Sequence, residues 1–182
     1  TFARIIISLV LKVVAVMGIV SACCKDELCK MTTDNVIDKK DFFLVKIPDS
    51  KKHLPRNFTI ANNDNGNLSC VDLLRKYINL RPENCAIIRF FLPSQNGKCA
   101  NQPVGKNIFA RISSEITKIL KLENADKYTG HSFRRTSATL LADTGVKLLG
   151  LKRHGGWQSS SIAESYVAES WTKKMDTASK IL

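Results

Sequence analysis

The sequence predicts one domain of the α+β class, mainly α-helical, with a small three-stranded antiparallel sheet. Its 182 residues are enough for one ordinary hydrophobic core and too few for two. Residues 32–60 contain short runs of β-branched and aromatic residues separated by polar turns, which is typical of short strands. From Lys106 onward apolar residues recur at helical spacing.

The first predicted element is the apolar run 5–24, which Lys12 and two serines interrupt. Its length would allow a membrane span or, with Arg4 ahead of it, a signal peptide. A lysine near the middle of a span costs about 2.5–3.5 kcal/mol, and the run passes directly into the charged segment KDELCK. We therefore expect a buried helix of a soluble domain, with a membrane-anchored protein as the less favoured alternative.

In the middle of the chain the spacing of the apolar residues changes from helical to strand-like. Within residues 32–60 the segments VIDKK, DFFLVKIP and LPRNFTI predict a three-stranded antiparallel meander. Four further segments are predicted in order: a polar loop (61–69), a helix with Val71, Leu74 and Ile78 on one side that ends before Arg81-Pro82, a short extended run (87–92), and a turn-rich loop (93–105).

Five helices are predicted in the last part of the chain. The first spans 107–122, and its apolar stripe contains Ile108, Phe109, Ile112, Ile116, Ile119 and Leu120. The second begins near Ser132 and ends near Gly145, a residue that tolerates the left-handed conformation closing many helices. Its ~100° step puts Phe133, Ser137 and Leu140 on one side, and His131, Arg134, Arg135 and Ala138 on the opposite side. The remaining helices span about 146–153, 161–169 and 171 to the end, and Ser161 with Glu164 resembles a capping box.

Charge and cysteine usage narrow the function. The chain has 28 Lys and Arg against 16 Asp and Glu, a formal charge of +12, which favours a polyanionic partner such as nucleic acid. A well-solvated surface would explain the same charge. The cysteines show neither a C-x-x-C pair nor regular spacing, so we expect free thiols in a reducing compartment and no zinc site; they are Cys23, Cys24, Cys29, Cys70, Cys85 and Cys99.

Two motifs near the C-terminus carry chemistry. HSFRR contains His131 and Arg134, and GGW places Trp157 nine residues before Tyr166. Together with VKIPDSKKHLPRNF they resemble the tyrosine recombinases of the phage-integrase kind, closest to those of eukaryotic mobile elements. The resemblance extends from about Lys12 to Ser170. It implies DNA breakage and rejoining through a 3′-phosphotyrosyl bond, without metal or cofactor.

The resemblance also implies a role for individual residues, and each role suits the residue type. A tyrosine can take a phosphate reversibly, a guanidinium can clamp phosphate oxygens in the transition state, a histidine can exchange protons near neutral pH, and an indole N–H can donate to phosphate. The assigned residues are Tyr166 as nucleophile, Arg134 as clamp, His131 as hydrogen-bond donor or acid–base group, Lys51 as proton donor to the leaving 5′-oxygen, and Trp157. Lys52 competes with Lys51, and Tyr166 and Trp157 could also be ordinary core aromatics. His154 lies twelve residues before the tyrosine and receives no role.

The sequence departs from the family at one position. The family supplies a further phosphate-clamping arginine in a context like A-R-x-x-E-L, whereas this chain reads SACCKDEL and places Cys24 there. Lys25 is adjacent, but one helical step turns a side chain by ~100°. Losing one such donor costs about 10²–10³ in rate. Activity is therefore in question, and the close alternative is an inactive DNA-binding remnant.

The same resemblance implies partners. Double-stranded DNA is the expected ligand, contacted by Arg135, Lys52, Lys152 and Arg153, and self-association into a dimer or tetramer is expected on it. Type IB topoisomerases use a similar residue set, but the motif spacing fits recombinases better. We expect residues 1–182 to be a single catalytic domain without the N-terminal core-binding domain of the family. The expected location is the nucleus in a eukaryote and otherwise the cytoplasm.

Overall fold

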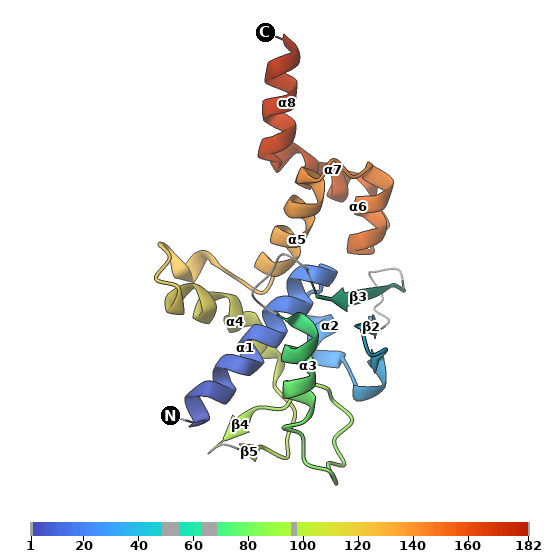
Figure 1. Cartoon of the computed structure of the whole chain (residues 1–182). Coiled ribbons are helices and arrows are strands. Elements are labelled where there is room, and N and C mark those ends of the chain that lie inside the picture. The colour runs from blue at the N-terminus through green and yellow to red at the C-terminus, as the bar shows by residue number, and fades with distance from the viewer. Residues whose placement is uncertain (1, 49–54, 63–68, 96–97, 182) are drawn as a thin grey trace.

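Helices form most of the structure, and a three-stranded sheet lies at one side of them (Figure 1). The computed structural model describes residues 2–48, 55–62, 69–95 and 98–181. The mainly α class with a small antiparallel sheet is confirmed. The elements are α1 (Phe2–Ser21), α2 (Lys25–Lys30), η1 (Thr33–Asn35), β1 (Val36–Asp38), β2 (Phe42–Lys46), β3 (Asn57–Ala61), α3 (Cys70–Ile78), β4 (Ser94–Gln95), β5 (Lys98–Cys99), α4 (Lys106–Ile119), η2 (Ala125–Lys127), α5 (Ser132–Asp143), α6 (Leu148–Gly155), α7 (Ser160–Glu169) and α8 (Trp171–Ile181).

Helix α1 is the buried centre of the N-terminal half. Val13, Val14 and Met17 are fully buried, and the helix contacts α3, α4, α5 and β3. The prediction of a buried helix is confirmed for this part, although the helix ends at Ser21. Within the described ranges, no helix has both the length and the apolar character that a membrane crossing needs.

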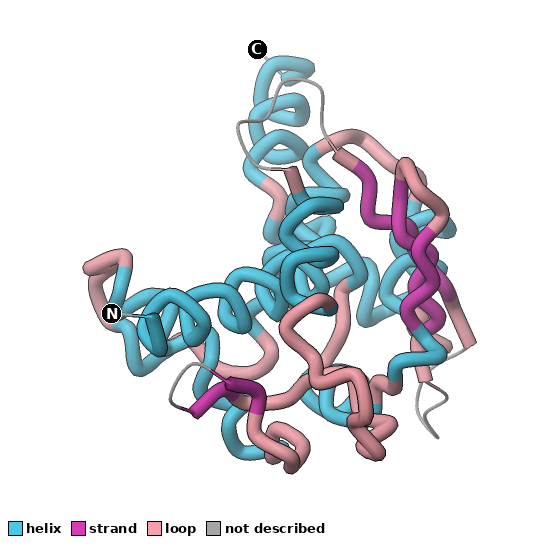
Figure 2. The backbone as a smooth tube through the Cα atoms, turned by 60° about the horizontal axis from the view of Figure 1, so that its bottom comes forward, coloured by secondary structure: helices cyan, strands magenta, loops and turns pink. Residues whose placement is uncertain are grey.

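The sheet is the predicted antiparallel meander, in the order β1-β2-β3. Figure 2 shows its strands running side by side along one edge of the helical body. Phe43 pairs with Ile60, and both are buried, as expected where alternate residues of a strand face the core. The connection from β2 to β3 includes residues 49–54, which lie outside the described ranges.

The segment between α3 and α4 differs from the prediction. Residues 87–92 are extended, and the Phe90 amide donates to the Met31 carbonyl at 2.8 Å. The sequence predicts only a loop for the following residues, yet Ser94–Gln95 and Lys98–Cys99 pair as two short antiparallel strands. Strands of two residues are too short to show an alternating pattern, so periodicity could not predict them.

The apolar stripe of α4 is only partly correct. Phe109 and Ile112 are 2% exposed, but Ile108 and Ile119 are 50% and 65% exposed. Helix α4 meets α1 and α2, and the face directed at these helices is narrower than the predicted stripe.

The predicted division of α5 into an apolar and a basic face is wrong. Arg134 and Ala138 are buried, whereas Leu140 is 54% exposed. The helix contacts α1, α6 and α7, and Arg134 is buried because an acidic partner neutralises it. A Cβ on Gly18 of α1 would lie 2.9 Å from the Phe133 ring, so this glycine allows α1 and α5 to approach closely.

The last helices enclose a second, smaller core. Its buried members are Ala138, Ala142, Leu151, Trp157 and Ala163. Gly145 has a φ of +79°, which confirms it as the left-handed residue after α5. The cap of α7 differs from the predicted Ser161–Glu164 pair, since Ser159 accepts a hydrogen bond from the Ser161 amide at 3.2 Å. Helix α8 extends away from the body (Figure 1).

Candidate active site

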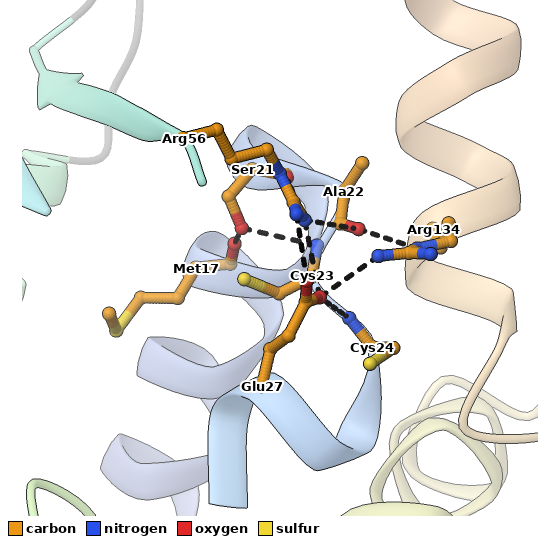
Figure 3. Close-up of polar contacts among 8 residues, drawn as sticks. All are labelled: Met17, Ser21, Ala22, Cys23, Cys24, Glu27, Arg56 and Arg134. Atoms are coloured by element: carbon orange, nitrogen blue, oxygen red, sulfur yellow. Dashed lines mark hydrogen bonds and ion pairs between the residues drawn. The ribbon is translucent and has the colours of Figure 1, made fainter. Parts of the chain in front are cut away.

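The candidate site is built on the sharp corner between α1 and α2. Ala22 at this corner has a φ of +50°, and the Ser21 hydroxyl accepts the Cys23 amide at 3.2 Å. Cys24 is the residue before the first turn of α2, and its amide donates to Oε2 of Glu27 at 2.7 Å. The corner therefore directs the Glu27 carboxylate back towards the end of α1, as Figure 3 shows.

Glu27 holds two arginines that come from distant parts of the chain. Arg134 of α5 donates from Nη2 to Oε2 of Glu27 at 2.9 Å and from Nε to the Ala22 carbonyl at 2.8 Å. Arg56, which precedes β3, donates from Nη1 to Oε1 at 2.7 Å and from Nη2 to Oε2 at 3.2 Å. The Glu27 side chain is 1% exposed, and those of Arg56 and Arg134 are 8% and 7% exposed. The carboxylate thus fixes two guanidinium groups in one buried cluster (Figure 3).

The cluster carries a net positive charge, since one carboxylate faces two guanidinium groups. Burial acts to raise the pKa of Glu27, but the hydrogen bond and charge of Arg56, followed by the charge of Arg134, hold that pKa below its ordinary value. Glu27 is therefore ionised at neutral pH. A preorganised cluster of this kind suits an anion such as a phosphate.

Cys24 contributes no charge to this cluster. Its thiol is half-buried, and burial and the neighbouring Glu27 carboxylate raise its pKa. A neutral thiol is a weak hydrogen-bond donor. Cys24 thus lies at the cluster, at the position where the family resemblance implies an arginine, and its thiol cannot replace a guanidinium.

A second polar pair lies one helical turn further along α5. The Ser137 hydroxyl and Nε2 of His154, in the last turn of α6, are 2.7 Å apart. Burial first, and then the charges of Arg56 and Arg134, lower the pKa of His154. His154 is therefore a neutral imidazole close to both arginines.

The GGW motif closes α6 and places the indole. Gly156 has a φ of +66°, and the amides of Gly156 and Trp157 donate back to the carbonyls of Arg153 and Lys152. A Cβ on Gly155 would lie 2.5 Å from the Trp157 ring, so only glycine leaves room for the indole. Trp157 is 2% exposed as a result.

Tyr166 lies on this indole. The ring centroids of Trp157 and Tyr166 are 5.0 Å apart with an interplanar angle of 22°. Tyr166 is half-buried on α7, and α7 packs against both α5 and α6. The stack therefore fixes the tyrosine on the element next to the helix that bears Arg134.

A comparison with protein families identifies the family of this chain. Residues 17–172 match the phage integrase family. The chain belongs to this family. Comparison with curated proteins gives no match.

The solved structures similar to this integrase domain include recombinases and integrases. XerA recombinase matches with a TM-score of 0.71 and 16% identity, over 98% of this chain and 62% of that one. XerH recombinase in a post-cleavage complex with its palindromic difH substrate matches with a TM-score of 0.69 and 15% identity, over 93% and 45%. A lambda integrase dimer bound to a COC′ core site matches with a TM-score of 0.58 and 17% identity, over 87% and 52%. The chain thus spans between 45% and 62% of the length of these proteins, and the fold is that of the tyrosine-recombinase catalytic domain.

The integrase domain brings some of the predicted site residues together. Cys24 and Arg134 meet at Glu27, and Trp157 meets Tyr166. His131 is exposed at the residue before α5, and its amide donates to the Thr129 hydroxyl at 3.4 Å. Of the predicted DNA contacts, Arg135 and Arg153 are exposed and Lys152 is half-buried. Lys51 and Lys52 lie outside the described residues.

The sequence does not predict the roles of four residues in the site. Arg56 is one of 28 basic residues and carries no motif, so its pairing with Glu27 depends on how the sheet docks against α1. Glu27 belongs to the motif that aligns Cys24, but no motif marks it as the partner of two arginines. Ser137 and His154 are seventeen residues apart; the HGGW sequence drew attention to the histidine, but its serine partner follows from the packing of α5 on α6.

Proposed function

We propose that the chain is a DNA recombinase catalytic domain that breaks and rejoins strands through a 3′-phosphotyrosyl intermediate. The observation that carries this proposal is the stack of Tyr166 on Trp157, on a helix packed against the one that bears Arg134, in an integrase-family fold. The DNA complexes of XerH recombinase and lambda integrase support it. The formal charge of +12 is the sign needed for a DNA partner.

In this reaction the Tyr166 oxygen attacks a backbone phosphorus, and the 5′-oxygen of the next nucleotide leaves. Charge builds on the non-bridging oxygens, where Arg134 stabilises it with charge-assisted hydrogen bonds. His131, exposed at the helix end one turn before Arg134, takes the proton that the Tyr166 hydroxyl loses. Lys51 protonates the leaving oxygen, and the Trp157 indole N–H donates to the phosphate while its ring supports the nucleophile.

We further propose that Cys24 lowers the rate of this chain relative to a domain with arginine there. One missing donor of this kind costs about 10²–10³ in rate. The competing function, a DNA-binding remnant without turnover, is favoured by the same cysteine. The remnant would keep the fold and the basic surface but would form no covalent intermediate.

Assembly on DNA into a dimer or tetramer is part of the proposal. Helix α8 extends from the body (Figure 1) and exposes Trp171 and Met175 by 73% and 67%. Apolar surface of this size on a projecting helix suits contact with another protein surface, and a second copy of the chain is the occupant we propose. The lambda integrase structure is a dimer. The proposed location is the nucleus if the chain comes from a eukaryote, and otherwise the cytoplasm.

The test is incubation with nicked suicide duplexes, followed by denaturing gels that reveal a covalent protein–DNA adduct. The expected result is an adduct in the parent chain that Tyr166→Phe abolishes, because phenylalanine keeps the stack on Trp157 and lacks the attacking oxygen. Tyr128→Phe is the matched control, since Tyr128 is a partly exposed tyrosine in an unrelated loop. If both the parent chain and Cys24→Arg bind DNA but form no adduct, the chain is a DNA-binding remnant without turnover.

A further inference from the structure

His154 occupies a place in the site that the reaction proposed above does not use. It lies three residues before Trp157 in sequence, and its Nε2 is 2.7 Å from the Ser137 hydroxyl. Ser137 is 4% exposed and follows Arg134 by three residues on α5, so the two side chains lie on the same face of the helix. The imidazole is therefore anchored one helical turn from the phosphate-clamping arginine.

The charged groups around His154 come from several elements. Arg134 approaches from α5 and Arg56 from the start of β3, and both charges act on the imidazole. Helix α6 itself adds Lys152 and Arg153 in its last turn. Helix α7 packs against α6 and carries Tyr166, which stacks on Trp157.

Glu27, the acidic residue of the cluster, already pairs with the two arginines. Both Glu27 oxygens are bonded to the arginines, so the environment of His154 among the described residues is positive. A half-buried imidazole in such surroundings remains neutral. It would gain a proton if a negative charge entered the site.

We propose that His154 is a phosphate-responsive residue of this site: it takes up a proton when a DNA phosphate enters beside Arg134, and the imidazolium then adds positive charge to a cluster in which Cys24 supplies none. This inference rests on the proposed DNA-binding function. The proton comes from solvent and binds the imidazole, Nε2–H donates to the Ser137 oxygen, and no other bond forms or breaks. The phosphate offsets the repulsion from Arg56 and Arg134 that disfavours the cation.

The coupling has a measurable consequence in both directions. If the phosphate raises the pKa of His154, protonation of His154 must tighten DNA binding by the same factor. Each pKa unit of increase corresponds to about a tenfold difference in affinity between the protonated and the neutral protein. DNA affinity should therefore rise as pH falls through the range in which His154 titrates.

The experiment is an NMR titration of the imidazole signals of the full chain against pH, alone and with a mixed-sequence DNA duplex. The chain contains three histidines, so His53→Gln, His131→Gln and His154→Gln identify each signal. We expect the pKa of His154 to be below its ordinary value in the free chain and at least one unit higher with DNA. In binding assays His154→Gln should lose the corresponding tenfold pH dependence, because glutamine can still bond Ser137 but cannot titrate, and His53→Gln should keep it.

A pKa of His154 that stays constant or falls while the duplex is bound would overturn the inference, as would a pH dependence that disappears in His131→Gln and persists in His154→Gln. If His154→Gln does not fold, the other two variants still assign the His154 signal by elimination. A chain that binds no duplex at any pH would refute the proposed function itself. A chain that binds the duplex without proton uptake by His154 would refute only this inference.

Discussion

At the scale of single residues, Glu27 determines how the site is held. Its carboxylate is almost fully buried and accepts from Arg56, Arg134 and the Cys24 amide. A buried ion pair is weak evidence for a net gain in stability, but removing one partner leaves the others uncompensated. The three-way contact therefore makes Glu27 more costly to replace than either arginine alone.

We predict that Glu27→Gln lowers the free energy of unfolding by about 3 kcal/mol, measured by urea denaturation. Asp26→Asn is the matched control, because Asp26 is the adjacent acid in an exposed pair with Lys106, and it should change stability far less. An equal effect of the two substitutions would contradict the central role of Glu27.

The pH dependence of stability follows from the same contacts. The folded-state pKa of Glu27 is lowered, so its contribution to stability is complete above the unfolded value of about 4.3 and is lost as pH falls through the lower folded value. Acid unfolding of the parent chain should therefore include a component that Glu27→Gln lacks. Denaturation curves collected from neutral pH down to about pH 3 test this.

We predict that Cys24→Arg raises the rate of adduct formation on a suicide substrate by about 10²–10³. The substitution puts a guanidinium next to Glu27 and Arg134, where the present thiol is neutral. Cys24→Lys should gain much less, because a point charge lacks the two-pronged geometry of arginine. DNA affinity should change less than the rate, since the clamp acts mainly in the transition state. Equal rates for the parent and Cys24→Arg would show that another group already supplies this charge.

At the scale of elements, the end of α6 places the aromatic stack. Gly156 adopts the left-handed turn, and Gly155 leaves space for the Trp157 ring. Packing thus requires the sequence Gly155-Gly156-Trp157 at this helix end. It explains why Trp157 is buried in the second core while supporting Tyr166.

We predict that Gly155→Ala destabilises the domain by about 1–3 kcal/mol, because its Cβ would lie 2.5 Å from the indole. Adduct formation should fall as well, since the ring beneath Tyr166 must move. Gly150→Ala in the same helix puts its Cβ 2.8 Å from a single methyl of Val146. It should cost less than the clash with the indole ring, and the better helix propensity of alanine offsets part of that cost. Urea denaturation followed by tryptophan fluorescence compares the two variants, and similar midpoints would argue against the packing requirement.

The elements show which features periodicity can predict. Helices α1 and α3 and the three-stranded meander follow from apolar spacing, and the left-handed end of α5 follows from Gly145. The predicted faces of α5 are wrong because a carboxylate distant in sequence, Glu27, allows Arg134 to be buried. In the same way, motifs located Tyr166 and Trp157, but Arg56 and the Ser137–His154 pair depend on contacts between elements far apart in sequence.

At the scale of the whole molecule, the charge of +12 predicts salt-sensitive binding to duplex DNA. Each phosphate that a basic residue neutralises releases counterions, so affinity should fall steeply between about 50 and 200 mM salt. Arg135→Gln should reduce the salt slope by about one. Arg75→Gln removes the same charge from a pair with Asp38 on another part of the surface and should leave the slope nearly unchanged. Fluorescence anisotropy with a labelled duplex measures both, and a flat salt dependence would contradict the DNA-binding function.

The shape of the molecule leads to the last prediction, which concerns assembly. Helix α8 is joined to the body at its base, where the Ser170 hydroxyl donates to Asp143 and accepts from the Lys173 amide, while Trp171 and Met175 are largely exposed. Covering such exposed apolar side chains with a second protein surface is favourable, because it removes apolar area from water.

We therefore expect the parent chain to assemble on DNA into dimers or larger species, and Trp171→Ser with Met175→Ser to remain at one copy per binding site. Ile119→Ser is the matched control, because Ile119 is 65% exposed on α4, away from the projecting helix. Sedimentation velocity of each protein with the same duplex measures the mass of the complex. Affinity for a single site should change little, since both serine substitutions leave the net charge intact. If the double variant and the parent sediment alike as multimers, the contact between copies lies on another surface; if both bind only as single copies, α8 does not mediate assembly in this chain.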